Sequence, residues 1–197
     1  NEDESSRRWE EYYSKKENMP GYSIPATEHS QMTIDGPEGE LEICRNYLKK
    51  FPNGIIACVS DSFDLFALIN EGWGGALKDL VTARKGILVV RPDSGDPLVI
   101  VLAVLEALGN KFGYTVNTKG YKVLEGHVRV IQGDGINFKS HAQILKIITD
   151  AGWSAENLAF GSGGALLQKV NRDTFAFAFK CCYAVIAGNA RDVYKRP

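Results

Sequence analysis

Residues 86–97, which read GILVVRPDSGDP, decide the fold that this sequence predicts. An apolar run typical of a strand buried on both faces leads directly into Arg91 and Asp93, and a proline stands where a helix would begin. Such strand-to-helix corners hold ligands in α/β sheets and barrels. Two later runs end in the same way, in GDG at 133–135 and in GSGG at 161–164. The sequence therefore predicts three polar or glycine-rich corners at one rim.

The composition indicates a globular protein with one substantial core. The chain has 197 residues, of which 44% are apolar and 24% charged, and its net charge is -1. Such a balance supplies no basic field for nucleic acid. We find no apolar run long enough for a membrane span, and residues 1–20 are too charged for a signal peptide. We therefore expect a cytoplasmic protein with neither a nucleic-acid nor a membrane partner.

The cysteines predict no metal site and no disulfide. Cys44, Cys58, Cys181 and Cys182 lack the spacing of a zinc site, and an adjacent pair rarely closes a disulfide. Three of them lie in apolar runs, so we expect reduced core residues of a cytosolic protein.

Strands and helices alternate along most of the chain. We expect strands at 55–59, 86–91, 127–132 and 158–161, helices over 40–51, 63–69, 97–108 and around 144–148, a connection at 113–126, a helix at 165–170 and a one-faced strand at 175–186. Gly109 and Gly152 are expected to end two of these helices. This alternation predicts a parallel α/β protein. A closed (β/α)₈ barrel needs eight strands and about 250 residues, so we expect an incomplete barrel.

Several corner residues are candidate ligands for phosphate and ribose. Backbone N–H groups of Gly163 and Gly164 can point at a phosphate, and Arg172 and Lys180 would supply the positive charge. A plain tight turn is the alternative for the glycines. Arg91 suits phosphate and Asp93 a ribose diol, unless the two form a mutual salt bridge. Asp134 is similarly placed, with an ordinary β-turn aspartate as its alternative.

One histidine has a carboxylate as its possible orienting partner. His29 follows an extended segment, and Asp61 stands at the end of the next expected strand. A histidine held by a carboxylate is the arrangement of a nucleophile or a general base. On spacing alone, a surface histidine is the more common case. The sequence suggests no such carboxylate partner for His127 or His141, and we assign them no role.

With these residues in view, the chain resembles the nicotinamide phosphoribosyltransferase family. The resemblance is nearly colinear from residue 20 to about residue 196. The matching stretches are PGYSIPA (20–26), EHS (28–30), VSDS (59–62), RPDSG (91–95), KGYK (119–122), RVIQGDG (129–135), AFGSGG (159–164) and LLQK (166–169).

The resemblance implies a cytosolic homodimeric glycosyltransferase with a barrel of the type II phosphoribosyltransferase kind. Its reaction would join nicotinamide to 5-phosphoribosyl 1-diphosphate, which gives nicotinamide mononucleotide and diphosphate for NAD biosynthesis. It also implies Mg²⁺ bound with the diphosphate, without an assigned protein ligand, and ATP hydrolysis through a phosphorylated histidine that matches His29. Residues 1–19 would form a polar N-terminal helix or tail, and residues 20–197 the partial barrel.

Position by position, the resemblance implies a role for each candidate. The catalytic group would be His29, the carboxylate beside it, Asp61, and Asp93. Arg91 and Asp93 would grip the diphosphate and ribose, Gly133 and Asp134 the ribose, Gly163, Gly164 and Arg172 the 5′-phosphate, Lys180 the phosphates, and Ser23 would lie beside the nicotinamide amide.

The chain departs from that family in length. Family members extend further at both ends, and they grip the nicotinamide ring largely from an N-terminal part. We therefore expect half a nicotinamide site, with an isolated chain that is inactive or weak. One alternative is a nicotinate-type phosphoribosyltransferase, which would need extra basic groups for a substrate carboxylate. Another is a non-catalytic fragment or paralogue that acts as a binding or dimerisation module.

Overall fold

The computed structural model describes residues 24–161, 170–171, 173–176, 178 and 181–193. The chain divides into two compact units, Asn1–Gly161 and Ser162–Pro197. The elements of the first unit are α2 His29–Met32, α3 Gly36–Lys50, β1 Asn53–Val59, α4 Leu65–Ala67, the π-helix η2 Leu68–Ala76, α5 Lys78–Ala83, β2 Lys85–Arg91, α6 Pro97–Phe112, β3 Tyr114–Val116, β4 Lys122–Leu124, β5 Val128–Gln132, α7 Phe138–Asp150, the 3₁₀ turn η3 Ala155–Asn157 and β6 Leu158–Phe160.

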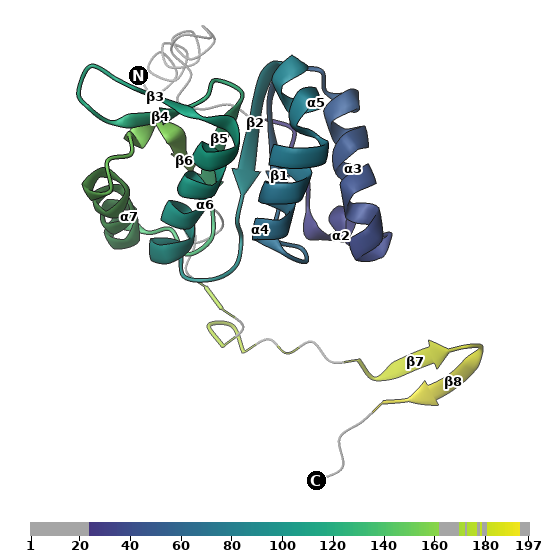
Figure 1. The fold of residues 1–197 in the computed structure, drawn as a ribbon. Helices are drawn as coiled ribbons and strands as arrows, with labels where there is room; N and C mark the ends of the chain where they lie inside the picture. Colours follow the sequence, from purple (N-terminus) through teal and green to yellow (C-terminus); the bar gives the residue numbers. More distant parts are fainter. Residues whose placement is uncertain (1–23, 162–169, 172, 177, 179–180, 194–197) are drawn as a thin grey trace, which may run out of the picture. The chain divides into compact units, whose positions relative to one another are not determined.

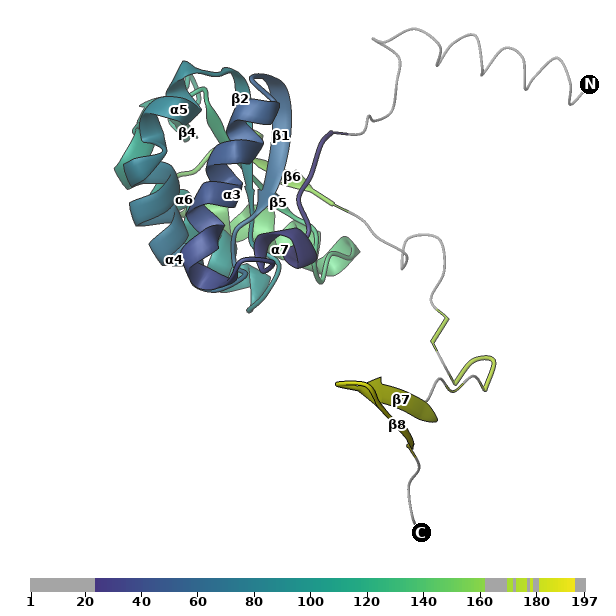
Figure 2. The same ribbon diagram turned by 90° about the vertical axis from the view of Figure 1, so that its right-hand side faces the viewer.

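A four-stranded parallel sheet organises the first unit. Its spatial order is β1-β2-β5-β6, so each strand is added beside the one before it in the chain. Right-handed crossovers between strands added in one direction place their helices on the same face. Figures 1 and 2 show α3, α5 and α6 along one face of this sheet. The prediction of a parallel α/β protein is confirmed.

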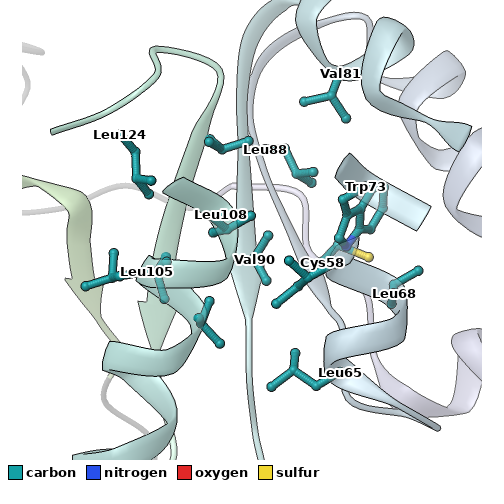
Figure 3. Close-up of a cluster of buried hydrophobic side chains, with 14 of the residues drawn as sticks. Cys58, Leu65, Leu68, Trp73, Val81, Leu88, Val90, Leu105, Leu108 and Leu124 are labelled. Atoms are coloured by element: carbon teal, nitrogen blue, oxygen red, sulfur yellow. The ribbon is translucent and has the colours of Figure 1, made fainter. Parts of the chain in front are cut away.

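The core lies between that face and the helices. Alternate strand residues, among them Cys58, Leu88 and Val90, point toward the helices and have no exposed surface. Figure 3 shows them facing Trp73 and Leu105 from the helical layer. Because side chains alternate across a strand, the intervening residues belong to the opposite face. The packing of the helices against this face therefore holds the strands, and the corners at their ends, in place.

Helix α6 continues past the glycine that was expected to end it. The helix runs to Phe112, and Gly109 lies inside it, buried. A Cβ on Gly109 would lie 2.6 Å from the Trp153 ring, so the glycine makes room for that ring. The helix ends instead at Gly113, whose φ of +89° suits glycine. The predicted end at residue 108 was wrong for this packing reason.

The expected connection at 113–126 contains a hairpin. Strands β3 and β4 pair antiparallel, and Asn117 turns the chain between them by accepting hydrogen bonds from the backbone of Lys119 and Tyr121. The helix expected at 63–69 is also different. Asp64 caps the short α4 through Phe66 N–H and Ala67 N–H, and a π-helix follows.

The second unit contains a hairpin of strands β7 Tyr183–Ile186 and β8 Asn189–Asp192. The strand predicted over 175–186 was wrong at its start, because residues 173–176 form a turn. Asn171 Oδ1 accepts hydrogen bonds from the backbone of Asp173 and Thr174, which favours that turn.

The cysteine prediction holds for one pair only. Cys44 and Cys58 are free and buried, as expected. Cys181 and Cys182 are free but exposed, so their expected core position was wrong. Within the part of the chain that the structure describes, no helix is long and apolar enough to cross a membrane.

Candidate functional site

The candidate site lies at the carboxyl edge of the sheet, where the four parallel strands end. Hydrogen bonds join the neighbouring corners there. Ser60 N–H donates to Arg91 O at 3.0 Å, and Gly161 N–H donates to Gln132 O at 2.9 Å. A Cβ on Gly135 would lie 3.8 Å from Pro97, so the corner after β5 also reaches the segment after β2. The corners after β2 and β5 therefore share one edge with Gly161, the one residue of the third predicted corner that the structure describes.

His29 and two carboxylates meet at this edge. His29 is the first residue of α2, and its Nε2 lies 3.1 Å from Asp61 Oδ1. Its Nδ1 lies 3.8 Å from Asp93 Oδ2, which is beyond hydrogen-bond range. The imidazole is 43% exposed and the Asp61 side chain 5%. One ring nitrogen is thus held by a buried carboxylate while the ring remains accessible to a ligand.

Asp61 is held by the corner of the neighbouring strand. Its Oδ2 accepts hydrogen bonds from Ser94 Oγ at 2.5 Å and from Asp93 N–H at 2.9 Å. Burial raises the pKa of the Asp61 carboxyl, but the hydrogen bonds from Ser94, Asp93 and His29 together lower it below its ordinary value. Asp61 is therefore an anion that orients His29. Sequence reasoning missed Ser94, although it stands one residue after Asp93.

A π-helix supports the same corner from behind, which the sequence did not predict. Trp73 in η2 donates from Nε1 to Ser60 Oγ at 3.2 Å, and Ser60 Oγ donates to Cys58 O at 3.0 Å. Ser60 and Trp73 have no exposed surface. Asp61 follows Ser60 directly, so these hydrogen bonds fix the backbone from which the Asp61 side chain extends.

Arg91, the last residue of β2, does not pair with Asp93 in the way the alternative interpretation supposed. Its Nη2 donates to Glu28 Oε2 at 3.2 Å and to Thr27 O at 3.3 Å. Its Nε is buried and has no partner among the described residues. The guanidinium therefore retains a donor at the carboxyl edge.

The corner after β5 is shaped by contacts of its backbone rather than by the Asp134 side chain. Gln132 Nε2 donates to Asp134 O at 2.9 Å, whereas the Asp134 side chain is exposed. A Cβ on Gly161 would lie 3.1 Å from Gly133 Cα, but one on Gly133 would meet nothing within 4 Å. Gly161 thus allows two corners to approach closely, and Gly133 leaves open space beside them.

A buried glutamate near the site was also missed. Glu40 is 7% exposed, and its Oε1 has no partner among the described residues. Burial, followed by the negative charges of Asp61 and Asp64, raises the pKa of Glu40 above its ordinary value. Its position four residues before the buried Cys44 of α3 is the signal that could have revealed it.

A cavity of about 350 Å³ lies against the sheet face opposite the helices. Alternate strand residues line it, including Ile87, Val89 and Ile131, together with Arg129. Its lining is mostly apolar with a few polar groups, including Arg129 and Glu156, which is typical of small-molecule sites.

Five predicted site residues lie outside the described residues, namely Ser23, Gly163, Gly164, Arg172 and Lys180. In the described ranges, no group of three or more His, Cys, Asp or Glu side chains could hold a metal ion.

Comparison with known proteins points to one enzyme family. Residues 11–197 match the nicotinate phosphoribosyltransferase (NAPRTase) family. Curated proteins named nicotinamide phosphoribosyltransferase are similar to most of the chain. The protein from Xanthomonas campestris pv. campestris (strain 8004) is 54% identical over 181 residues, or 91% of this chain and 38% of the relative. Those from Mycoplasma pneumoniae and Acinetobacter baylyi are 36% and 33% identical over 95% of this chain, and over 45% and 41% of the relatives. The chain thus spans less than half the length of the curated relatives it matches.

Proposed function

The chain belongs to the nicotinate phosphoribosyltransferase family, and we propose that it carries the phosphoribosyl- and diphosphate-binding part of a nicotinamide phosphoribosyltransferase. The whole enzyme transfers the 5-phosphoribosyl group from phosphoribosyl diphosphate to nicotinamide, and releases nicotinamide mononucleotide and diphosphate. The observation that carries this proposal is the convergence of His29, Asp61, Asp93 and Arg91 at one sheet edge. The curated relatives bear the same name.

The geometry suits a reaction in which positive charge develops on the ribosyl carbon. Loss of diphosphate requires a clamp for the phosphates and a hold on the ribose, rather than a strong base. In the proposed enzyme Arg91 binds the diphosphate, and Asp93 and the Gly133–Asp134 corner bind the ribose. We further propose that Ser23 contacts the nicotinamide amide, that Lys180 contacts the phosphates, and that Gly163, Gly164 and Arg172 bind the 5′-phosphate; these five residues lie outside the described ranges.

His29 is proposed to accept a phosphoryl group from ATP. Asp61 holds Nε2 at 3.1 Å, so Nδ1 is the ring nitrogen left for another partner. The described residues offer no cluster for a metal ion. We propose that Mg²⁺ binds together with the diphosphate, whose charge it would offset, and we assign it no protein ligand.

The assembly is proposed to be a (β/α) barrel in a cytoplasmic homodimer. Two features support the barrel. The strands follow one another in chain order, and the face opposite the helices is hollow and apolar. In a barrel this face is the interior.

Calorimetry tests the diphosphate role of Arg91. Arg91→Ala should weaken binding of phosphoribosyl diphosphate to the 197-residue chain by about 1.5–3 kcal/mol, which is the scale of a charge-assisted hydrogen bond. Arg45→Ala is the matched control, because Arg45 also pairs with a glutamate, at 3.1 Å, but on α3. Equal affinity in wild type and Arg91→Ala would refute the assignment.

Phosphate labelling tests the role of His29. Incubation with ATP labelled at its γ-phosphate should leave acid-labile label on the wild type and none on His29→Ala. His127→Ala is the control, because His127 also lies 2.8 Å from a carboxylate, that of Glu125, but at the start of β5. Label that persists on His29→Ala would show that another residue is the acceptor.

A further inference from the structure

Arg91, the proposed diphosphate ligand, is already paired with a carboxylate of its own chain. The Glu28 carboxylate lies 3.2 Å from Nη2 and is 64% exposed, whereas the Arg91 side chain is 19% exposed. The two residues are far apart in sequence, so the pair forms only in the folded chain. An exposed carboxylate can move away into water while the guanidinium stays in place.

Carboxylate and phosphate oxygens are equivalent partners for a guanidinium, since both accept its planar N–H groups. A single exposed ion pair is weak. A diphosphate carries several negative charges, and it can therefore replace a carboxylate at this arginine. Glu28 is the carboxylate that diphosphate would have to replace at Arg91.

The segment that carries Glu28 also carries His29. Thr27 is fixed to β1, because its N–H donates to Ala57 O at 3.2 Å and its Oγ1 accepts from Val59 N–H at 3.0 Å. On the other side, the His29 ring is held by Asp61. Glu28 is the link between these two anchored residues. Its side chain is held by Arg91, so the partner of Arg91 affects the backbone that places His29.

We propose that Glu28 is an internal counter-anion, which occupies Arg91 in the free protein and is displaced by the diphosphate group of the substrate. This displacement changes the position of His29 and so couples the two halves of the site. The inference rests on the proposed function of Arg91. Because coupling between sites is reciprocal, whatever holds His29 also changes the affinity for diphosphate.

The first test compares inorganic diphosphate binding by calorimetry at low salt. Glu28→Gln keeps the shape of the side chain and removes its charge, so it should bind diphosphate about two- to fivefold more tightly than the wild type. The gain should shrink at high salt, because screening weakens exposed charges. Glu42→Gln is the control. It removes the charge of another exposed carboxylate, which pairs with Arg45 at 3.1 Å, and its affinity should equal that of the wild type.

The second test follows the His29 imidazole by NMR. Diphosphate should displace its resonances in the wild type, and ligand-free Glu28→Gln should already show them displaced in the same direction. Glu42→Gln should not. Glu28 is also the N-cap of α2 and forms a capping box with Gln31, so the loss of a purely structural role could move the His29 resonances too. A purely structural role would leave the affinity for diphosphate unchanged, which the first test measures.

The outcomes separate the two ideas. If wild type and Glu28→Gln bind diphosphate equally, or if the His29 resonances of the ligand-free variant match the wild type, the inference is overturned and the role of Arg91 stands. If neither protein binds diphosphate, both are overturned.

Discussion

The two edges of the sheet carry the same kinds of side chain in different settings. At the amino edge, Arg84 is buried, and it donates to Phe51 O at 2.9 Å and to Gly54 O at 3.1 Å. At the carboxyl edge, Arg91 pairs with the exposed Glu28 and retains an Nε without a partner among the described residues. Arg84 also keeps a buried Nη1 without a partner among the described residues. The two arginines differ in what they bond, because Arg84 bonds backbone carbonyls alone, whereas Arg91 bonds one carbonyl and an exposed carboxylate that a ligand can replace.

Two histidine–carboxylate pairs repeat this contrast. Glu125 accepts hydrogen bonds from the ring and the backbone N–H of His127, only two residues away. Asp61 and His29 are 32 residues apart, and the neighbouring strand supplies further donors to Asp61. The amino-edge pair is local and self-contained. The carboxyl-edge pair forms only when distant segments come together in the fold. The residue types are alike at the two edges, so the features that mark the site are this long-range pairing and the accessible ring of His29.

The largest expected effect separates the two arginines. Arg84→Ala should lower the free energy of unfolding by about 2–4 kcal/mol, because two backbone carbonyls lose their donor. Arg91→Ala should lower it by less than about 1 kcal/mol, because its partner carboxylate is exposed. Urea denaturation measures both. A larger loss for Arg91→Ala would contradict the division of roles between the edges.

The next effect separates the two carboxylates. Asp61→Asn should lower the free energy of unfolding at pH 7 by about 2–3 kcal/mol, because an amide N–H₂ would face donors. Glu125→Gln should cost less than about 1 kcal/mol, because its contacts are partly exposed and local. Urea denaturation at pH 7 tests both, and equal losses would mean that assembly from distant segments adds nothing.

The Asp61→Asn variant also has an expected pH dependence. The lowered pKa of Asp61 means that its stabilising contribution is present above the ordinary pKa of an aspartic acid and is lost as the pH falls through the lowered value. The difference between wild type and Asp61→Asn should therefore shrink on acidification. A difference that stays constant down to acid unfolding would show that the charge of Asp61 is not responsible.

Two glycines at the carboxyl edge give a smaller effect. Gly161→Ala should lower the free energy of unfolding by about 1–2 kcal/mol, because the new Cβ would lie 3.1 Å from Gly133 Cα, within the backbone of the next corner. Gly133→Ala adds a Cβ that meets nothing within 4 Å, and its stability should match the wild type. Thermal unfolding of both variants measures this. Equal stability would show that the close approach of the corners is not needed.

Sequence patterns predicted the sheet well, and they predicted which described candidate residues would lie at its carboxyl edge. Apolar runs that end in polar residues located β1, β2 and β5, and the parallel arrangement followed from the alternation. That arrangement alone placed Asp61 and Asp93 at one edge. The pairing of His29 with Asp61 was predicted as one of two possibilities, and the structure favours it.

What the sequence did not predict depends on contacts between distant segments. Gly109 was expected to end a helix because glycine is common just after a helix C-terminus, but packing against Trp153 places it inside the helix. The partner of Arg91 comes from a segment more than 60 residues earlier, so no local pattern could reveal Glu28. The hairpin at 114–124 was predictable from Asn117 and Gly120, which favour a turn, and it was missed.

The smallest expected effect concerns Glu40, a buried glutamate at the carboxyl edge whose Oε1 has no hydrogen-bond partner among the described residues. Its raised pKa, caused by burial and then by Asp61 and Asp64, means that its contribution to stability is favourable below the ordinary pKa of a glutamic acid and is lost as the pH rises through the raised value. Glu40→Gln should therefore gain stability relative to the wild type between pH 4 and pH 8. Glu42→Gln, on the exposed face of the same helix, should show no such trend. Urea denaturation at both pH values measures the difference. If the two variants behave alike, the buried carboxyl must have a partner that satisfies its charge. The polar groups around Glu40 would then be satisfied by the chain itself, as those of the His127–Glu125 pair are at the amino edge.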